Sequence, residues 1–298
     1  PDSAMRICFY ILFTIFSSTS GFAARDIPVA VNGVLDLRES ITSDNFIYNL
    51  NGEWEFYWNK MLHPFDFETG SVAPVYYGRV PSYWTDYPEA IVGKGKEGFA
   101  TYRMLILLPP GFRKPLGFDV PVFDSSYDIY VNGKYFGGNG IPGRTEDEAK
   151  PGYDRLFFRY EPVSDTLTVV INVSNFSHRR GGFWLPVKMG TFSDVQRPLA
   201  NSFAGSWATI SLLLGFSLFF LFFFIMYPKE KGMAYFSLAT IGLAFRPLFT
   251  SHFLINNLFD IEWTWIVRFE YLGLYVIIIG WLWFAHSLYP NKIYKNIT

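Results

Sequence analysis

The stretch FAGSWATISLLLGFSLFFLFFFIMY, residues Phe203–Tyr227, decides the plan of this chain. It contains no charged residue. A helix needs about 20 apolar residues to cross a hydrocarbon core about 30 Å thick, so this stretch is long enough to span a membrane. We predict a transmembrane helix here, with a folded domain before it and further membrane segments after it.

The composition agrees with such a plan. Of the 298 residues, 17% are charged and 20% are aromatic, a balance that favours a membrane protein with a β-rich partner domain. The net charge of −1 gives no sign of nucleic-acid binding or of a polybasic tail. We therefore expect a lipid bilayer, and no nucleic acid, as a partner.

The first residues have the pattern of a secretory signal peptide, which we place at 5–24. Arg6 supplies the positive charge, Ile7–Phe16 form the short apolar core, and small residues lead to cleavage after Ala23 or Ala24. An uncleaved anchor is the alternative, although the run is short for a span. Cys8 is the only cysteine, so the processed chain is expected to contain no disulfide and no thiolate site.

Residues 25–199 read as one strand after another with turn signals between them, which is typical of an all-β sandwich or jelly roll. Asn132-Gly133 between two short apolar runs predicts a β-hairpin. A helical turn at Thr145–Lys150 is an alternative to a loop there. The predicted strands are Gly52–Trp58, Ala100–Leu108, Leu116–Phe123, Tyr127–Val131, Lys134–Phe136, Leu156–Tyr160, Leu167–Val173 and Phe183–Met189.

The hairpin region carries a resemblance. Asp124-Ser125 through Tyr130-Val131-Asn132-Gly133 gives the pattern D-S-x-x-x-x-Y-V-N-G, preceded by a Tyr-Arg strand at Phe99–Leu108. This resembles the galactose-binding-like jelly roll of β-galactosidase and β-glucuronidase accessory domains, over roughly residues 53–190. The resemblance implies a carbohydrate-like ligand, held by loops at one end of the sandwich.

Two more stretches, Leu50–Trp58 and Asn175–Trp184, resemble the extracellular domain of bacterial seven-transmembrane receptors with diverse intracellular signalling modules. That family implies a signal peptide, a jelly-roll sensor, seven helices and a cytoplasmic effector such as a cyclase, kinase or phosphatase. This sequence departs from the pattern at its end, because it reaches Thr298 with three apolar segments and no effector. We expect it to be the N-terminal part of a longer protein.

The most concentrated candidate ligand contacts are His178, Arg179, Arg180 and Trp184. Guanidinium groups suit carboxylates, phosphates and hydroxyl-rich ligands, and an indole face can stack on a sugar ring or a cation. The alternative is a strand-connecting loop near the membrane, whose arginines pair with acidic residues or with lipid phosphates.

Weaker candidates are Trp84, Tyr87 and the loop 137–140 with Asn139. Trp54 and Trp58 share one face of a strand, so we expect them to pack in the core.

Nothing in the sequence indicates catalysis, a cofactor or a metal. No motif places two carboxylates across a scissile bond, and no nucleophile elbow or phosphate-binding loop is present. The four histidines, His63, His178, His252 and His286, are scattered without metal-ligand spacing.

Three transmembrane helices are expected, at 203–227, 233–255 and 263–289, followed by the end 290–298. Lysines follow the first helix and the third helix, which places those two loops in the cytoplasm and the N-terminal domain outside. The signal peptide requires the same orientation. This favours the inner membrane of a bacterium, with a periplasmic domain joined to the first helix by a short connection at Phe192–Ser202.

Charged residues inside these helices are candidate functional groups, because charge in a bilayer is expensive unless it is paired or solvated. Counting 1.5 Å per residue places Arg246 and Glu270 at the same level, about 10 Å below the outer face. We predict that Arg246 pairs with Glu270, with Arg268 nearer the surface. Snorkelling of each charge to the headgroups is the alternative. Pro247 is expected to bend the second helix beside this pair.

Together these features favour a signal-transduction receptor whose periplasmic domain binds a small ligand. The rivals are a membrane-tethered carbohydrate-binding module without signalling, a glycosidase accessory domain and a transporter subunit. A homodimer fits this plan, although the sequence shows no recognisable dimer interface.

Overall fold

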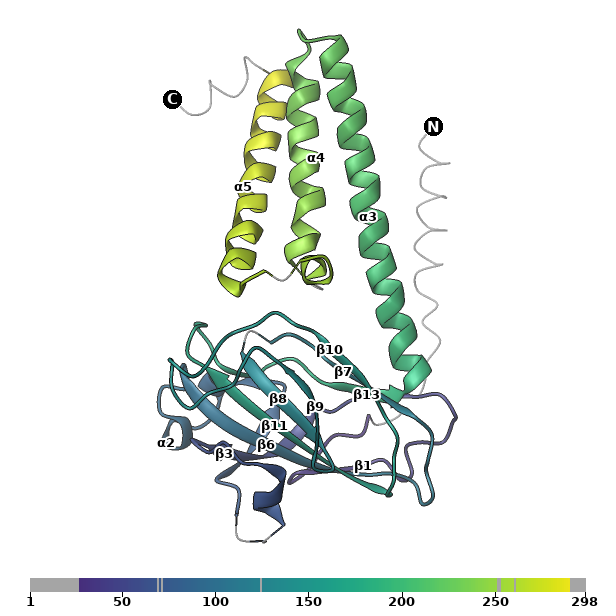
Figure 1. The fold of residues 1–298 in the computed structure, drawn as a ribbon, viewed down its shortest axis with the longest axis vertical. Coiled ribbons are helices and arrows are strands. Elements are labelled where there is room, and N and C mark those ends of the chain that lie inside the picture. The colour runs from purple at the N-terminus through teal and green to yellow at the C-terminus, as the bar shows by residue number, and fades with distance from the viewer. Residues whose placement is uncertain are drawn as a thin grey trace, which may run out of the picture.

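The computed structural model describes residues 27–289, apart from 69, 71, 124, 251, 252 and 260. The predicted signal peptide at 5–24 with Cys8, the end 290–298, Asp124 and His252 therefore lie outside the described residues. Within the described part, a β-rich region comes first and three long helices follow it (Figure 1). The helices stand over one side of the β-rich region.

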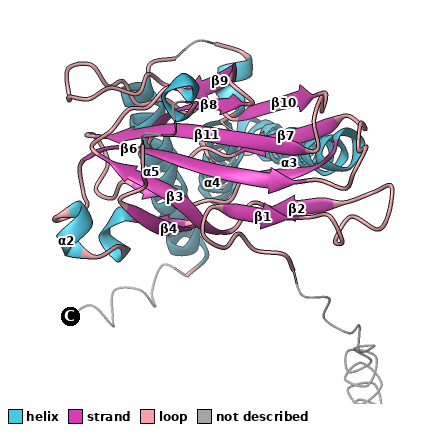
Figure 2. Ribbon diagram, turned by 90° about the horizontal axis from the view of Figure 1, so that it is seen from below, coloured by secondary structure: helices cyan, strands magenta, loops and turns pink. Residues whose placement is uncertain are grey.

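Two main sheets enclose the core of the β-rich region. The larger sheet has seven strands in the order β4-β3-β6-β11-β8-β9, with β1 parallel to β6, and the smaller has four in the order β10-β7-β13-β2. The seven-stranded sheet lies on the side away from the helices (Figure 2). Its strands are β1 Val34–Asp36, β3 Gly52–Trp58, β4 Tyr76–Val80, β6 Gly98–Leu107, β8 Ser126–Val131, β9 Lys134–Asn139 and β11 Thr166–Asn175. The smaller sheet contains β2 Ile47–Asn49, β7 Leu116–Val120, β10 Leu156–Tyr160 and β13 Lys188–Thr191.

A third, two-stranded sheet pairs β5 Ser82–Tyr83 with β12 Gly182–Phe183. The predicted strand Phe183–Met189 is thus two strands, β12 and β13. Pro186 lies between them and has no N–H to donate to a ladder. The expected all-β sandwich is present at the level of packed, mainly antiparallel sheets, and its jelly-roll connectivity stays a prediction.

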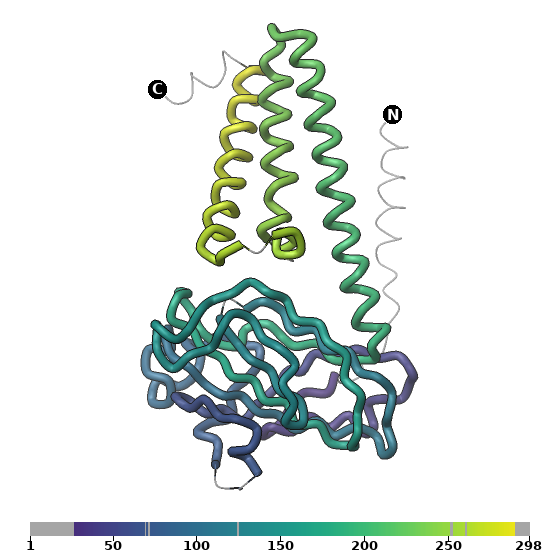
Figure 3. The backbone as a smooth tube through the Cα atoms, viewed as in Figure 1, coloured from purple at the N-terminus to yellow at the C-terminus, as the bar shows by residue number. Residues whose placement is uncertain are grey.

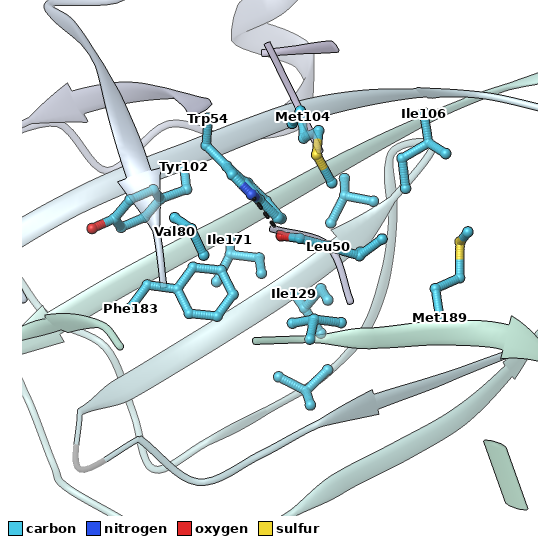
Figure 4. Packing of buried hydrophobic residues seen from close by; sticks show 14 of the residues in the cluster. Leu50, Trp54, Val80, Tyr102, Met104, Ile106, Ile129, Ile171, Phe183 and Met189 are labelled. Atoms are coloured by element: carbon cyan, nitrogen blue, oxygen red, sulfur yellow. Dashed lines mark hydrogen bonds between the residues drawn. The ribbon is translucent and has the colours of Figure 1, made fainter. Parts of the chain in front are cut away.

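The core between the sheets is rich in large aromatic side chains (Figure 4). Trp54 on β3 is fully buried and donates its indole N–H to the Leu50 carbonyl at 3.0 Å. The prediction that Trp54 is a core residue is confirmed. Trp58, on the same face of β3, is only half-buried, and its ring packs edge-on against Trp84 at 4.9 Å.

The predicted hairpin at Asn132-Gly133 is confirmed, since it joins antiparallel strands β8 and β9. Both turn residues have positive φ, 46° for Asn132 and 80° for Gly133, as a type I′ turn requires. The Asn132 side-chain oxygen also accepts the Thr168 N–H at 2.6 Å. The turn residue therefore holds the hairpin against β11 as well as closing it.

Several short elements were not predicted. Strands β1, β2, β4 and β5 have two to five residues each, too few for a clear alternation of apolar and polar positions. The same holds for the short helices η1 Pro64–Phe67, η2 Trp84–Asp86 and α2 Glu89–Val92. The helical turn expected as an alternative at 145–150 is present as a single turn within a loop, since the Ala149 N–H donates to the Thr145 carbonyl at 3.0 Å. The loop ends in a bridge between Ile141 and Lys150.

The three helices are α3 Phe192–Met226, α4 Lys231–Phe249 and α5 Trp263–Leu288, and each is long and apolar enough to cross a membrane. Helix α3 begins well before residue 203, so the expected connection 192–202 is itself helical. Helix α4 ends at Phe249, short of residue 255. Pro247 removes one backbone hydrogen bond, and the Thr250 hydroxyl donates to the Arg246 carbonyl at 3.1 Å, which closes the last turn.

The three helices run side by side (Figure 3), and small residues lie where neighbouring helices meet. Ser217 of α3 and Ser237 of α4 lie hydroxyl to hydroxyl at 2.8 Å, and each also donates to the other's carbonyl. Between α4 and α5, a Cβ on Gly280 would come within 2.7 Å of the Ala239 backbone nitrogen. Close backbone approach at glycine and serine is how helices associate where the solvent is as apolar as their side chains.

The aromatic core contains one hydroxyl whose loss should be costly. The Trp84 indole donates to the Tyr102 hydroxyl at 2.8 Å, and burial raises the pKa of Tyr102 above its ordinary range, so it stays a neutral acceptor. We expect Tyr102→Phe to lower the free energy of unfolding by about 1–3 kcal/mol, because the buried Trp84 N–H is left unsatisfied. Denaturant unfolding measures this. Tyr77→Phe at an exposed position is the control and should change stability by less than about 0.5 kcal/mol.

Candidate functional site

Beside α3, the β-rich region touches the helices through four aromatic side chains and one amide, which we call the seam: Tyr153 and His178 on the β side, and Phe253, Asn256 and Trp263 on the helix side. The Tyr153 ring stacks on Phe253 with centroids 4.2 Å apart and planes 11° apart. The His178 ring meets Trp263 edge to face at 5.2 Å. Stacked and edge-to-face rings are the favoured aromatic geometries, so the seam is a packed contact.

A polar contact fixes the register of the seam. Phe253 has φ 46°, and this turn leads into the short helix η3, Leu254–Asn257. Asn256 on η3 donates to the Tyr153 carbonyl at 2.9 Å and to an Asp154 carboxylate oxygen at 3.1 Å. The segment between α4 and α5 is therefore held to the loop that precedes β10.

Buried apolar side chains support the seam from the helix side. Phe249 at the end of α4, Ile255 on η3 and Ile266 in α5 form one cluster with Tyr153. All four are less than a tenth exposed. A displacement of the Tyr153 loop would therefore disturb the ends of both helices, since close-packed side chains transmit strain.

A cleft of about 770 Å³ opens beside the seam, between the β-rich region and the start of α5. Tyr153 and Trp263 present aromatic surface to it, Lys150 contributes a cation, and Asp154 and Glu262 contribute carboxylates. Concave sites that combine aromatic walls with a few polar groups suit small polar ligands. The lining therefore offers hydrogen-bond donors and acceptors beside aromatic surface.

The predicted contacts around residue 180 divide into two groups. His178 lies in the seam. The Arg180 guanidinium lies over the Tyr83 ring at 5.1 Å, and Tyr83 stacks on Trp184 at 5.5 Å. Trp184 is half-buried and donates its indole N–H to the Phe123 carbonyl at 2.7 Å.

Arg180 and Trp184 are thus brought together through Tyr83, which the sequence did not single out. Arg179 is exposed and lies outside this stack of a cation and two rings. The stack is adjacent to the seam along the chain, and it leaves Arg179 and Arg180 at the surface.

Two predicted ligand contacts are wrong. Trp84 is fully buried, with its N–H used by Tyr102, so a ligand cannot reach it. Asn139 is also fully buried, where its amide donates to the Ser125 carbonyl at 2.9 Å and accepts from the Asp154 N–H at 2.8 Å. Residues 137–139 belong to strand β9, so most of the predicted glycine-rich loop is strand.

Tyr87, the third weak candidate, is also largely buried. Its hydroxyl donates to the Arg79 carbonyl at 2.9 Å. Trp84, Tyr87 and Asn139 therefore serve the packing of the β region.

The three charged residues predicted to lie within the membrane are near the helix ends that face the β region. Arg246 is in the last turn of α4 and is exposed, and a Cβ on Gly273 of α5 would lie 4.0 Å from its Cα. Glu270 is half-buried and lies one turn before Gly273 on α5. The Arg268 guanidinium stacks over Trp265 at 4.8 Å. The pairing of Arg246 with Glu270 stays a prediction.

The seam residues Tyr153, Asn256 and Trp263 were not singled out from the sequence as site residues. Tyr153 lies in an irregular loop and Asn256 between two apolar segments, so no periodicity marks either. Among the described residues, no group of three or more His, Cys, Asp or Glu is arranged to hold a metal ion.

No protein family profile matches the chain, and no curated protein matches it. Solved structures with partial similarity include a GH2 β-galacturonidase from Eisenbergiella tayi bound to galacturonate, at 13% identity and a TM-score of 0.35. The matched region covers 49% of this chain and 24% of that enzyme. The β-glucuronidase of Ruminococcus gnavus is 16% identical with a TM-score of 0.37, and the match covers 50% of this chain and 28% of that enzyme. The β-glucuronidase of Faecalibacterium prausnitzii is 12% identical with a TM-score of 0.36, and the match covers 49% of this chain and 31% of that enzyme.

The chain thus spans less than a third of the length of each of these enzymes. At these TM-scores the likeness supports no conclusion about the architecture or the activity of this chain.

The polar contact of the seam can be tested directly. We expect Asn256→Ala to loosen the loop 150–156, because the variant loses both hydrogen bonds from Asn256, together worth about 1–3 kcal/mol. Hydrogen–deuterium exchange in that loop should rise in the variant. Asn257→Ala, at the exposed neighbouring position, is the control. Unchanged exchange in Asn256→Ala would show that the aromatic contacts alone hold the seam.

Proposed function

We propose that this chain is the receptor part of a membrane-bound signal-transduction protein, and that its β-rich domain binds a small, carbohydrate-like ligand outside the cytoplasm. The observation that carries the proposal is the cleft beside the seam, whose walls come from both the β domain and the start of α5. A ligand bound there contacts both parts at once. Its binding free energy can therefore depend on how the two parts are arranged, which is the requirement for any ligand-driven change.

The connection to α3 supports the same proposal. Strand β13 ends at Thr191 and α3 begins at Phe192, so no flexible linker separates sheet from helix. A movement of the sandwich relative to the seam would then shift α3 against α4. The resemblance to seven-transmembrane receptors with intracellular signalling modules adds a cytoplasmic effector, an inner-membrane location and a periplasmic domain to the proposal, along with a homodimer as one arrangement.

The second candidate is a membrane-tethered carbohydrate-binding module without signalling. The stack of Arg180, Tyr83 and Trp184 favours it, because Arg180 is at the surface and a site there would lie on the β region alone. The two candidates differ in what sugar binding does to the helices. Signalling requires a change in hydrogen exchange at the turn 227–230, which joins α3 to α4 on the far side of the bundle, whereas a tether requires none.

Ligand binding at the cleft can be tested with a panel of galactose, glucose and glucuronate. We expect Trp263→Ala to weaken binding of any sugar that the intact chain binds by about tenfold, because a stacking face is lost. Calorimetry on the chain in lipid nanodiscs measures the affinity. Trp265→Ala is the matched control, since Trp265 lies two residues further along α5, is exposed and does not line the cleft.

Loss of binding in Tyr83→Ala, with Trp263→Ala unaffected, would assign the site to the stack of Arg180, Tyr83 and Trp184 and favour the tether. Equal affinity in all variants would exclude both sites.

The proposed orientation makes a separate prediction. A fluorescent protein that folds only in the cytoplasm should be bright when fused after Thr298, and alkaline phosphatase fused there should be inactive. The reason is that three membrane crossings place the two ends of the chain on opposite sides. An active phosphatase at that position would contradict the receptor proposal.

A further inference from the structure

A second cleft, of about 570 Å³, lies between the first turns of α3 and the outer face of the four-stranded sheet. We call it the α3 cleft. It is separate from the cleft at the seam, with which it shares no lining residue. The residues that the argument uses are Ile47, Asn49, Asp119, Lys188, Val195 and Leu199.

The α3 cleft lies at the level of the lipid headgroups. Helix α3 has 35 residues and is about 52 Å long, whereas a hydrocarbon core is about 30 Å thick. The last charged residue of α3 is Arg197, and the predicted membrane span begins at Phe203, so Val195 and Leu199 lie within about 12 Å of the start of that span. The four-stranded sheet is the side of the β region that faces the helices (Figures 1 and 2).

Close packing fixes this geometry. A Cβ on Gly117 of β7 would lie 3.2 Å from the Phe192 Cα and 3.2 Å from the Val195 Cβ. A glycine at this position therefore lets α3 lie directly against the sheet. The Phe192 ring also packs on Phe157 of β10 at 5.4 Å. The wall that α3 gives to the cleft is held in place by these contacts.

The cleft carries one positive charge in excess. Asp119 on β7 is nearly fully buried and receives two hydrogen bonds from the Arg155 guanidinium, at 2.7 and 2.6 Å. This bidentate pair neutralises the carboxylate. Lys188 on β13 lies opposite Asp119 in register and is exposed, and within the described residues no carboxylate lies within ion-pair distance of it.

Apolar side chains lie beside this charge. Val195 and Leu199 line the helix wall, and Ile47 on β2 is 42% exposed at the opposite wall. Ile27 adds further exposed apolar surface at the same place. A cation next to an apolar wall, open toward a bilayer, is the combination that binds an anionic lipid.

We propose that the α3 cleft binds the headgroup of a monoanionic membrane phospholipid. Its phosphodiester lies against Lys188, with the Asn49 amide within the same wall to contact headgroup hydroxyls. Its acyl chains run along Leu199 into the bilayer. This site is independent of the proposed receptor function and of the ligand at the seam.

The test uses the full chain, purified in detergent and examined by native mass spectrometry with added phosphatidylglycerol or phosphatidylcholine. We expect phosphatidylglycerol to bind in preference to phosphatidylcholine. Lys188→Gln should reduce its retention about tenfold, because one charge-assisted contact is lost. Ile47→Glu should reduce it as well, since it adds a negative charge at the exposed rim of the cleft.

The matched control is Lys60→Gln. Lys60 is exposed, and its carbonyl accepts the Thr101 hydroxyl on the outer side of the seven-stranded sheet, away from the helices. It should retain the lipid as the intact chain does. Both substituted side chains in the cleft are at least partly exposed, so thermal unfolding should match that of the intact chain.

Three outcomes would overturn the proposal: equal retention of the two lipids, full retention in both cleft variants, or an equal loss in Lys60→Gln. Binding of inorganic phosphate that the cleft variants abolish, without any preference for phosphatidylglycerol, would assign the cleft to a soluble anion and would also overturn it.

Discussion

The junction between sheet and membrane helix is the constraint on which the rest of this structure depends. Thr191 ends β13, Phe192 begins α3, and Gly117 has no side chain to hold the helix away from β7. Sheet and helix therefore form one rigid connection at this corner. Since α4 packs on α3 and α5 packs on α4 through small residues, the position of the β region over the helices is largely fixed by where α3 leaves the sheet.

A rigid corner makes the second contact, at the seam, mechanically important. The sandwich is attached covalently at α3 and non-covalently at Tyr153, Asn256 and Trp263. If the non-covalent contact rearranges, the sandwich and α3 can shift together against α4 and α5. Both clefts lie at these two points, one at the corner and one at the seam. Groups that bind in either cleft would act on the relative position of sandwich and helices.

Many strands of the β domain could be predicted from the sequence, whereas the residues of the candidate site could not. Trp54 and the Asn132-Gly133 hairpin follow from local rules, because alternation and turn chemistry depend on neighbouring residues only. Trp84 and Asn139 were wrongly predicted as ligand contacts, because their burial depends on residues distant in the sequence. Their partners, Tyr102 for one and Ser125 and Asp154 for the other, are brought to them by strands from elsewhere in the chain.

The sequence by itself determined the plan: a β-rich domain followed by three helices apolar enough for a membrane, because hydropathy and strand alternation are properties of short stretches. The tertiary structure alone decided that α3 is continuous with the sheet, that Tyr153 meets Phe253, and that Lys188 lies unpaired beside the Asp119–Arg155 pair among the described residues. These are contacts between residues far apart in the chain, which follow from the register of strands and the packing of helices and not from any local pattern.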